Sequence, residues 1–211
     1  MPQLDNRTAF GASLDLSLDR DGRTCLVVVV AGSFELPAAG RPAPGPLRPS
    51  DLQPPPLLHD EYYGDPATSS LRREGQSTHL RPGTDIHLLG QAWAPRGRPT
   101  TRAFVHLSLG PCVQEAVITG PRRYLRGVAD LRPSAPEPFE RVPLRYEHCA
   151  GGPVEPRNPV AFAGARDALD RPLPQIEDPR HPLTSWRDRP PPAGFGPIAR
   201  SWLPRRAYAG T

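Results

Sequence analysis

The pattern of apolar and polar residues near the start of the chain predicts a β-hairpin over Leu14–Leu36. Leu14, Leu16 and Leu18 alternate with polar neighbours, which is typical of a strand with one buried face. The sequence DRDG at 19–22 supplies turn residues, and an apolar run from Thr24 leads back. Because positions 27–30 are valine on both faces, this second strand is expected to be a central one.

A second region of alternation predicts a β-meander. Its strands are expected at Thr84–Trp93, Thr100–Leu109 and Cys112–Gly120, with bends at 95–97 and 110–111 where proline and glycine interrupt the pattern. Arg141–His148 follows as a short strand, since Val142, Leu144 and Tyr146 would share one face. Further on, only Val160–Leu169 has the pattern of a short helix.

The composition favours strands over helices. The 211 residues include 31 prolines and 19 glycines, and an interior proline costs a helix about 3 kcal/mol. The predicted fold class is therefore mainly β, an antiparallel sheet or sandwich with long proline-rich loops and few short helices. Residues 37–56 form the longest such loop, and residues 1–211 are expected to form a single β-rich domain.

Charge and cysteine content restrict the kinds of partner and the cellular compartment that we expect for the protein. The net charge is +4, and all 26 basic residues are arginine. From Pro179 onward the sequence has six arginines against Asp188 alone, so the tail is basic. Three distant cysteines without CxxC spacing suggest neither a disulfide framework nor a zinc site. With no signal-peptide pattern and no apolar run of membrane-spanning length, we expect a cytoplasmic protein without a membrane partner.

A search for catalytic motifs gives no complete constellation. The sequence contains no GxSxG elbow and no glycine-rich phosphate loop. Cys149 follows His148 directly, and neighbours on a strand point to opposite faces, so these two cannot form a nucleophile–base pair there. We therefore predict no enzyme activity, no catalytic residues and no cofactor or metal.

Asp60, Glu61 and Asp65 form an acidic cluster that allows two interpretations. A turn at Gly64–Pro66 could bring the carboxylates together as metal ligands or as an acid/base pair, which would suggest a metal-dependent hydrolase. The alternative is that they tie down that turn and pair with Arg72 or Arg73. The second interpretation is favoured, because no EF-hand or HExxH spacing completes a metal site.

The basic tail also has more than one interpretation. Arginines interleaved with Trp186, Phe195 and Trp202 suit a nucleic-acid surface, because phosphate and base stacking use these residue types. They suit a protein interface equally, since tryptophan and arginine are frequent binding anchors. In a third interpretation Phe195 and Trp202 close the core while the arginines remain solvated.

Several stretches of the sequence together resemble the domain-of-unknown-function family 2169 of bacterial type VI secretion gene clusters. They keep the family's order and spacing, and they lie at 4–8, 60–72, 81–85, 143–147, 158–160, 173–179 and 192–205. Residues 148–153 depart from the family pattern, and the chain stops where family members continue. From that ending we expect the chain to be the N-terminal portion of a longer family domain.

The resemblance implies an adaptor or chaperone that binds a toxic effector and helps load it onto the VgrG/PAAR spike. Effector and spike proteins are thus the expected partners, with nucleic acid as the rival partner of the basic tail. Binding would use strand addition at a sheet edge or aromatic and arginine anchors. The predicted partner-binding residues are Asp60, Glu61, Tyr62, Asp65, Arg72, Phe195, Arg200, Trp202, Arg205 and Arg206.

Overall fold

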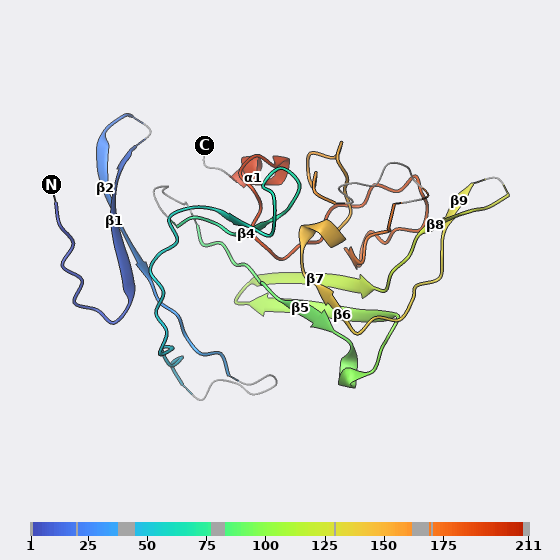
Figure 1. Ribbon diagram of the computed structural model, residues 1–211, viewed down its shortest axis with the longest axis horizontal. Coiled ribbons are helices and arrows are strands. Elements are labelled where there is room, and N and C mark those ends of the chain that lie inside the picture. Colours follow the sequence, from blue (N-terminus) through green and yellow to red (C-terminus); the bar gives the residue numbers. More distant parts are fainter. Residues whose placement is uncertain are drawn as a thin grey trace. The chain divides into compact units, whose positions relative to one another are not determined.

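The computed structural model describes residues 2–19, 21–37, 45–76, 83–128, 130–161, 169 and 171–208. It divides into two compact units, unit 1 (Met1–Glu61 and Glu74–Pro82) and unit 2 (Tyr62–Arg73 and Gly83–Thr211). Among the described residues, the secondary structure consists of short antiparallel sheets, two 3₁₀ turns and one α-helix (Figure 1). The prediction of a mainly β fold is confirmed.

The elements are described here in chain order. The strands are β1 (Gly11–Leu18), β2 (Thr24–Ala31), β3 (Glu61–Tyr62), β4 (Leu71–Arg73), β5 (Gln91–Trp93), β6 (Arg102–Leu109), β7 (Cys112–Thr119), β8 (Tyr124–Arg126), β9 (Leu131–Pro133), β10 (Arg141–Pro143) and β11 (Ile176–Glu177). The 3₁₀ turns are η1 (Pro95–Gly97) and η2 (Tyr146–His148), and the helix is α1 (Leu203–Tyr208). The sheets pair β1 with β2, β3 with β4, β5 with β10, and β8 with β9, and one three-stranded sheet has the order β11-β7-β6.

Unit 1 contains the predicted hairpin, β1 and β2. Leu14 faces Val28 and Leu16 faces Leu26 across the ladder. The turn is held by Asp19, whose Oδ1 accepts hydrogen bonds from the backbone of residues 21 and 23 at 2.9 and 2.7 Å. Gly22 has φ 79°, a conformation that glycine adopts without strain. The hairpin prediction is confirmed, with bounds Gly11–Ala31 instead of Leu14–Leu36.

The expectation that β2 is a central strand is wrong. In the described part of the chain β2 pairs with β1 alone, and its even-numbered residues are exposed while its odd-numbered residues are half-buried. Valine favours the pleated backbone of a strand whether or not both faces are covered. The valine run therefore identifies a strand without identifying its neighbours.

The described part of the proline-rich loop is anchored to residues 33–35, which follow β2. Pro49 forms an isolated bridge with Phe34. Gln53 accepts a hydrogen bond from the Ser33 backbone at 2.8 Å and donates one to the Ser33 carbonyl at 2.9 Å. These bonds add to two backbone ones, from Ser50 N to the Ser33 carbonyl and from Glu35 N to the Arg48 carbonyl, both 2.9 Å long. Residues 38–44 of the loop lie outside the described residues.

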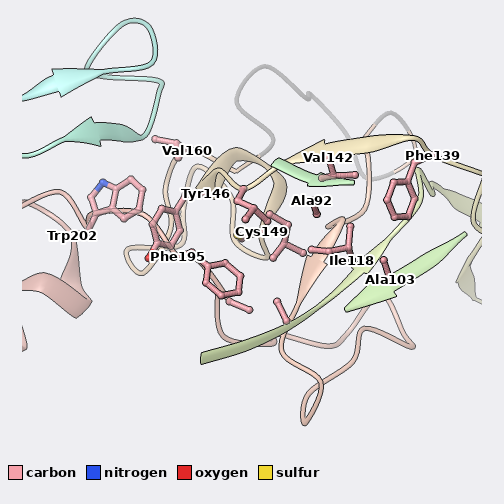
Figure 2. Close-up of a cluster of buried hydrophobic side chains, with 14 of the residues drawn as sticks. Ala92, Ala103, Ile118, Phe139, Val142, Tyr146, Cys149, Val160, Phe195 and Trp202 are labelled. Atoms are coloured by element: carbon pink, nitrogen blue, oxygen red, sulfur yellow. The ribbon is translucent and has the colours of Figure 1, made fainter. Parts of the chain in front are cut away.

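The core of unit 2 is built by strands and loops together. β6 and β7 form the predicted antiparallel pair, joined at 110–111, and Gly110 has φ 56°. Figure 2 shows the buried side chains, with Trp202, Tyr146 and Phe195 together near one end and Phe139 and Ala103 toward the other. Loop residues from 146 to 202 thus contribute as much to this core as the sheet does.

Two other expectations for unit 2 are wrong. The strand predicted at Thr84–Trp93 forms only at Gln91–Trp93, and it pairs with β10 rather than with β6. The strand predicted at Arg141–His148 ends at Pro143, after which Tyr146–His148 turns as η2. In both places the strand is limited to the residues that pair with a partner distant in sequence, β5 with β10, although the alternation continues beyond them. Most of the helix predicted at Val160–Leu169 lies outside the described residues, while Val160 and Ala161 form a turn.

Candidate partner-binding surfaces

The acidic cluster holds backbone turns. Asp65 Oδ1 accepts a hydrogen bond from the Ala67 backbone at 2.7 Å, and its carbonyl accepts bonds from the backbone of residues 68 and 69 at 3.0 and 2.8 Å. Asp60 Oδ1 accepts one from the Gly75 backbone at 2.8 Å. Within the described ranges, no three histidine, cysteine, aspartate or glutamate side chains lie close enough to hold a metal ion. Asp65 thus holds the predicted turn, and the pairing of this cluster with Arg72 or Arg73 stays a prediction.

The other predicted residues of this region lie on short strands. Glu61 and Tyr62 form β3 and are half-buried, and Arg72 lies in β4 and is exposed. Nothing in these positions tests whether they contact a partner. Their role in binding stays a prediction.

The two aromatic anchors predicted in the tail are core residues. Trp202 is 6% exposed and Phe195 is 5% exposed. The Trp202 ring meets the Tyr146 ring edge to face, with centroids 5.2 Å apart. These two positions agree with the third interpretation of the tail, in which Phe195 and Trp202 close the core. Both residues therefore have little exposed surface for contact with a partner.

The tail arginines differ from one another. Arg205 Nη1 lies 3.4 Å from Asp85 Oδ2, and its side chain is 15% exposed, so this charge helps to attach α1 to unit 2. Arg200 and Arg206 are exposed. These two remain candidates for contact with a partner.

The stretches that carry the family resemblance meet inside unit 2. Glu147 accepts hydrogen bonds from the Ser70 backbone at 2.7 Å and from the Ser70 hydroxyl at 2.6 Å. The Arg145 guanidinium lies 3.8 Å from the centre of the Tyr63 ring. Asn158 Nδ2 donates to the carbonyls of Tyr146 and Ala150 at 2.8 and 2.9 Å. These stretches therefore stabilise the fold of unit 2, because their polar groups form hydrogen bonds between the loops that surround the core.

The thiol and imidazole beside η2 are also structural. Cys149 is fully buried, and burial raises the pKa of its thiol. Burial likewise lowers the pKa of His148. Both shifts favour the neutral forms, so Cys149 is held as an inaccessible, uncharged thiol.

Sequence reasoning missed two exposed aromatic residues of unit 2. Trp93 is 63% exposed, and the Arg141 guanidinium lies 5.6 Å from its ring centre. Phe104 is 72% exposed, with the Arg102 guanidinium 5.7 Å from its ring centre. The neighbours of Trp93, Ala92 and Ala94, are buried. This alternation of small buried residues with an aromatic residue is visible in the sequence and could have indicated that the Trp93 side chain is exposed.

One face of the β1–β2 hairpin in unit 1 is apolar and exposed. We call it the hairpin face, and it consists of Leu14, Leu16, Leu18, Leu26, Val28 and Val30. All except Leu14 are between 49% and 68% exposed. The six residues come from alternate positions of both strands, so their side chains stand on the same side of the sheet. A continuous apolar surface results.

The loop after β11 gives unit 2 a pH-dependent contact. Asp178 accepts hydrogen bonds from the Arg180 backbone at 2.9 Å and from Arg180 Nε at 3.1 Å, and His181 Nδ1 lies 2.9 Å from its Oδ2. Burial by itself would raise the pKa of Asp178, but these hydrogen bonds outweigh burial and lower the pKa to about 2. The contact therefore requires the ionised carboxylate.

We expect Asp178 to stabilise unit 2 above about pH 4 and to lose this contribution as the pH falls toward about 2, because its folded pKa lies below the unfolded value of about 3.9. Urea unfolding followed by tryptophan fluorescence between these pH values measures it. Asp178→Asn should flatten the acid dependence, and Glu140→Gln, at an exposed position, should not. Equal slopes for Asp178→Asn and the wild type would contradict the assignment.

Comparison with known proteins adds one result. Residues 21–211 match the family model DUF2169, described as an uncharacterized protein conserved in bacteria. No curated protein and no solved structure matches the chain. Across the described segments, α1 has six residues and no helix has the length and apolar character needed to cross a bilayer.

Proposed function

This chain belongs to DUF2169, a family of uncharacterized proteins conserved in bacteria, and we propose that it is a non-enzymatic adaptor of a type VI secretion system. In this proposal the protein binds a toxic effector in the cytoplasm and helps to load it onto the VgrG/PAAR spike. The association with type VI secretion comes from the resemblance of the sequence to that family. The binding surface is inferred from the structure.

The observation that carries the proposal is the exposed hairpin face. A two-stranded hairpin is marginally stable in water unless a further strand or another element covers its apolar side. Exposed apolar surfaces of this kind mark protein contacts. Complete burial of one valine or leucine side chain is worth about 1.5–3 kcal/mol. Five side chains, each roughly half exposed, would therefore contribute on the order of 4–8 kcal/mol to a complex, before the costs of association.

A second observation in unit 2 supports protein binding. Trp93 and Phe104 are exposed, and each is accompanied by an arginine. Aromatic and arginine side chains contribute most of the binding energy in many interfaces. The arginine stacked beside each ring also reduces the number of rotamers that binding would have to restrict. Exposed aromatic side chains beside arginines, the type of binding anchor predicted for the tail, are thus present on β5 and β6.

We expect Leu26→Arg and Val28→Arg each to weaken effector binding about tenfold or more, because a charge would be buried on the hairpin face without a partner. The measurement is a pull-down, followed by titration, with the effector encoded beside the gene. Leu52→Arg is the matched control, since Leu52 is an exposed leucine of unit 1 outside the hairpin face. It should bind like the wild type.

Two results would count against the proposal at different levels. Unchanged binding by both hairpin variants would remove the hairpin face as the docking surface while leaving an adaptor role possible through unit 2. If deletion of the gene leaves the neighbouring effector stable and still secreted, the adaptor role itself is wrong.

A further inference from the structure

Unit 2 contains a pocket that the proposed adaptor role does not use. Its volume is about 280 Å³, and its floor is the second apolar cluster of the unit, Tyr124, Leu173 and Leu183. Trp186 forms part of the wall. Pockets for drug-sized ligands measure about 300–1,000 Å³, so this one has room for a small group with an apolar or aromatic body.

The charged residues of the pocket are three arginines and two carboxylates. Both carboxylates already have partners. Glu155 Oε1 lies 2.8 Å from Arg157 Nε, and Oε2 lies 3.2 Å from Arg157 Nη2. Asp188 Oδ2 accepts bonds from the backbone of residues 184 and 185 at 2.8 and 2.7 Å and from the Thr184 hydroxyl at 3.0 Å. The negative charges are thus used to hold the walls of the pocket.

Arg189 is held in a different way. Its Nη1 donates to the carbonyl oxygens of Trp186 and Asp188 at 2.9 and 2.8 Å. Carbonyl acceptors fix the position of a guanidinium, and the fixed group loses little further entropy when it binds a ligand. The charge of Arg189 also acts on the carboxylates of Glu155 and Asp188, but the lining as a whole keeps a net positive charge, with three arginines against these two carboxylates. Arg189 is therefore a positioned cation in the lining of the pocket.

Tyr124 contributes a hydroxyl-bearing side chain to the same pocket as Arg189. Burial raises the pKa of Tyr124. The phenol stays protonated at neutral pH and can donate its hydrogen. One guanidinium and one hydroxyl-bearing side chain thus line the same pocket as the apolar cluster.

We propose that this pocket binds a carboxylate carried on a small apolar or aromatic stem. The carboxylate would accept hydrogen bonds from Arg189 and from the Tyr124 hydroxyl, because a guanidinium fork matches the geometry of two carboxylate oxygens. The stem would lie against Trp186 and the leucines of the floor. Such a group can come from the C-terminus of a polypeptide or from a free organic acid.

Calorimetric titration of the full chain separates these two sources. The probes are phenylacetate, as a free acid, and N-acetyl-Leu-Phe, as a peptide C-terminus, each compared with its amide. At least one acid is expected to bind about tenfold or more tightly than its amide, since a charge-assisted contact is lost. Binding of phenylacetate alone identifies an organic acid, and binding of the peptide identifies a C-terminus. No binding of either acid up to about 10 mM overturns the proposal.

Two variants assign the binding to this pocket. Arg189→Gln should weaken acid binding about tenfold, and Tyr124→Phe should weaken it a few-fold. Arg206→Gln, an exposed arginine of α1, is the control. The Tyr124→Phe variant keeps the ring, so it provides a test even if Arg189→Gln fails to fold. Acid binding that is unchanged in both variants contradicts the assignment. The result does not depend on whether the adaptor role holds.

Discussion

Replacement of Arg122 by leucine is expected to destabilise unit 2 by about 3–5 kcal/mol. Arg122 Nη2 lies 2.8 Å from Glu177 Oε2, with the two side chains 10% and 6% exposed. Without the arginine, the carboxylate of Glu177 would remain buried with only neutral donors, the Thr119 hydroxyl at 3.0 Å and the Leu183 backbone at 3.0 Å. A buried charge that loses its counterion costs more than the ion pair contributes.

Urea unfolding measures this effect, with tryptophan fluorescence as the probe, because all three tryptophans lie in unit 2. Arg122→Leu combined with Glu177→Gln should recover much of the loss, since the glutamine is uncharged, its oxygen can accept from the Leu183 backbone, and its amide nitrogen can donate to the Thr119 hydroxyl oxygen. Arg123→Leu, at an exposed neighbouring position, should change the stability by about 0.5 kcal/mol or less. A small effect of Arg122→Leu, similar to that of Arg123→Leu, would mean that water reaches Glu177.

A second large effect is expected from Gly194→Ala, a loss of about 1–3 kcal/mol or more. A Cβ at residue 194 would overlap the Cε1 and Cζ atoms of the Tyr146 ring. The ring has little freedom to move away, because it packs edge to face on Trp202. Glycine is required here by close approach, since the atoms beside it belong to an aromatic ring fixed in the core.

Gly196→Ala provides the matched control two residues away. A Cβ at residue 196 would lie 3.9 Å from a methyl group of Leu89 and 4.0 Å from the Tyr146 ring, both ordinary contact distances. Alanine also restricts the unfolded chain more than glycine does, so the control is expected to be neutral or slightly stabilising. Thermal unfolding of both variants tests the contrast. Equal melting temperatures would show that the Tyr146 ring moves.

The sequence predicted the parts of the fold that depend on local pattern. β1 with β2 and β6 with β7 formed close to where alternation and turn residues placed them. In contrast, β11 has two residues, Ile176 and Glu177, and pairs with β7 nearly sixty positions earlier. A segment of two residues has no periodicity to detect. Its pairing with β7 depends on the path of the long loops between the two strands. The family was also predicted correctly, over residues 21–211.

The candidate surfaces were harder to predict, because hydrophobicity alone does not tell which aromatic residues are buried. Trp202 and Phe195 lie in the core, while Trp93 and Phe104 are exposed. Arginines flank both sets in the sequence. The two cases differ in structure, because Trp93 and Phe104 lie on strands, where neighbouring side chains point to opposite faces, and Trp202 and Phe195 lie outside the strands. The turn at Asp65 was more accessible, since its hydrogen bonds join residues within four positions.

The late position of Trp202 in the core of unit 2 has a consequence for the order of synthesis and folding. Trp202 packs on Tyr146, and Phe195 belongs to the same cluster, so this cluster has no complete packing until residue 202 has left the ribosome. The loops that it closes are long, and closing them costs entropy before late contacts compensate. The hairpin of unit 1, in contrast, needs no residue beyond Ala31 for its ladder. A nascent chain would therefore have every residue of the hairpin ladder available while unit 2 is still being translated.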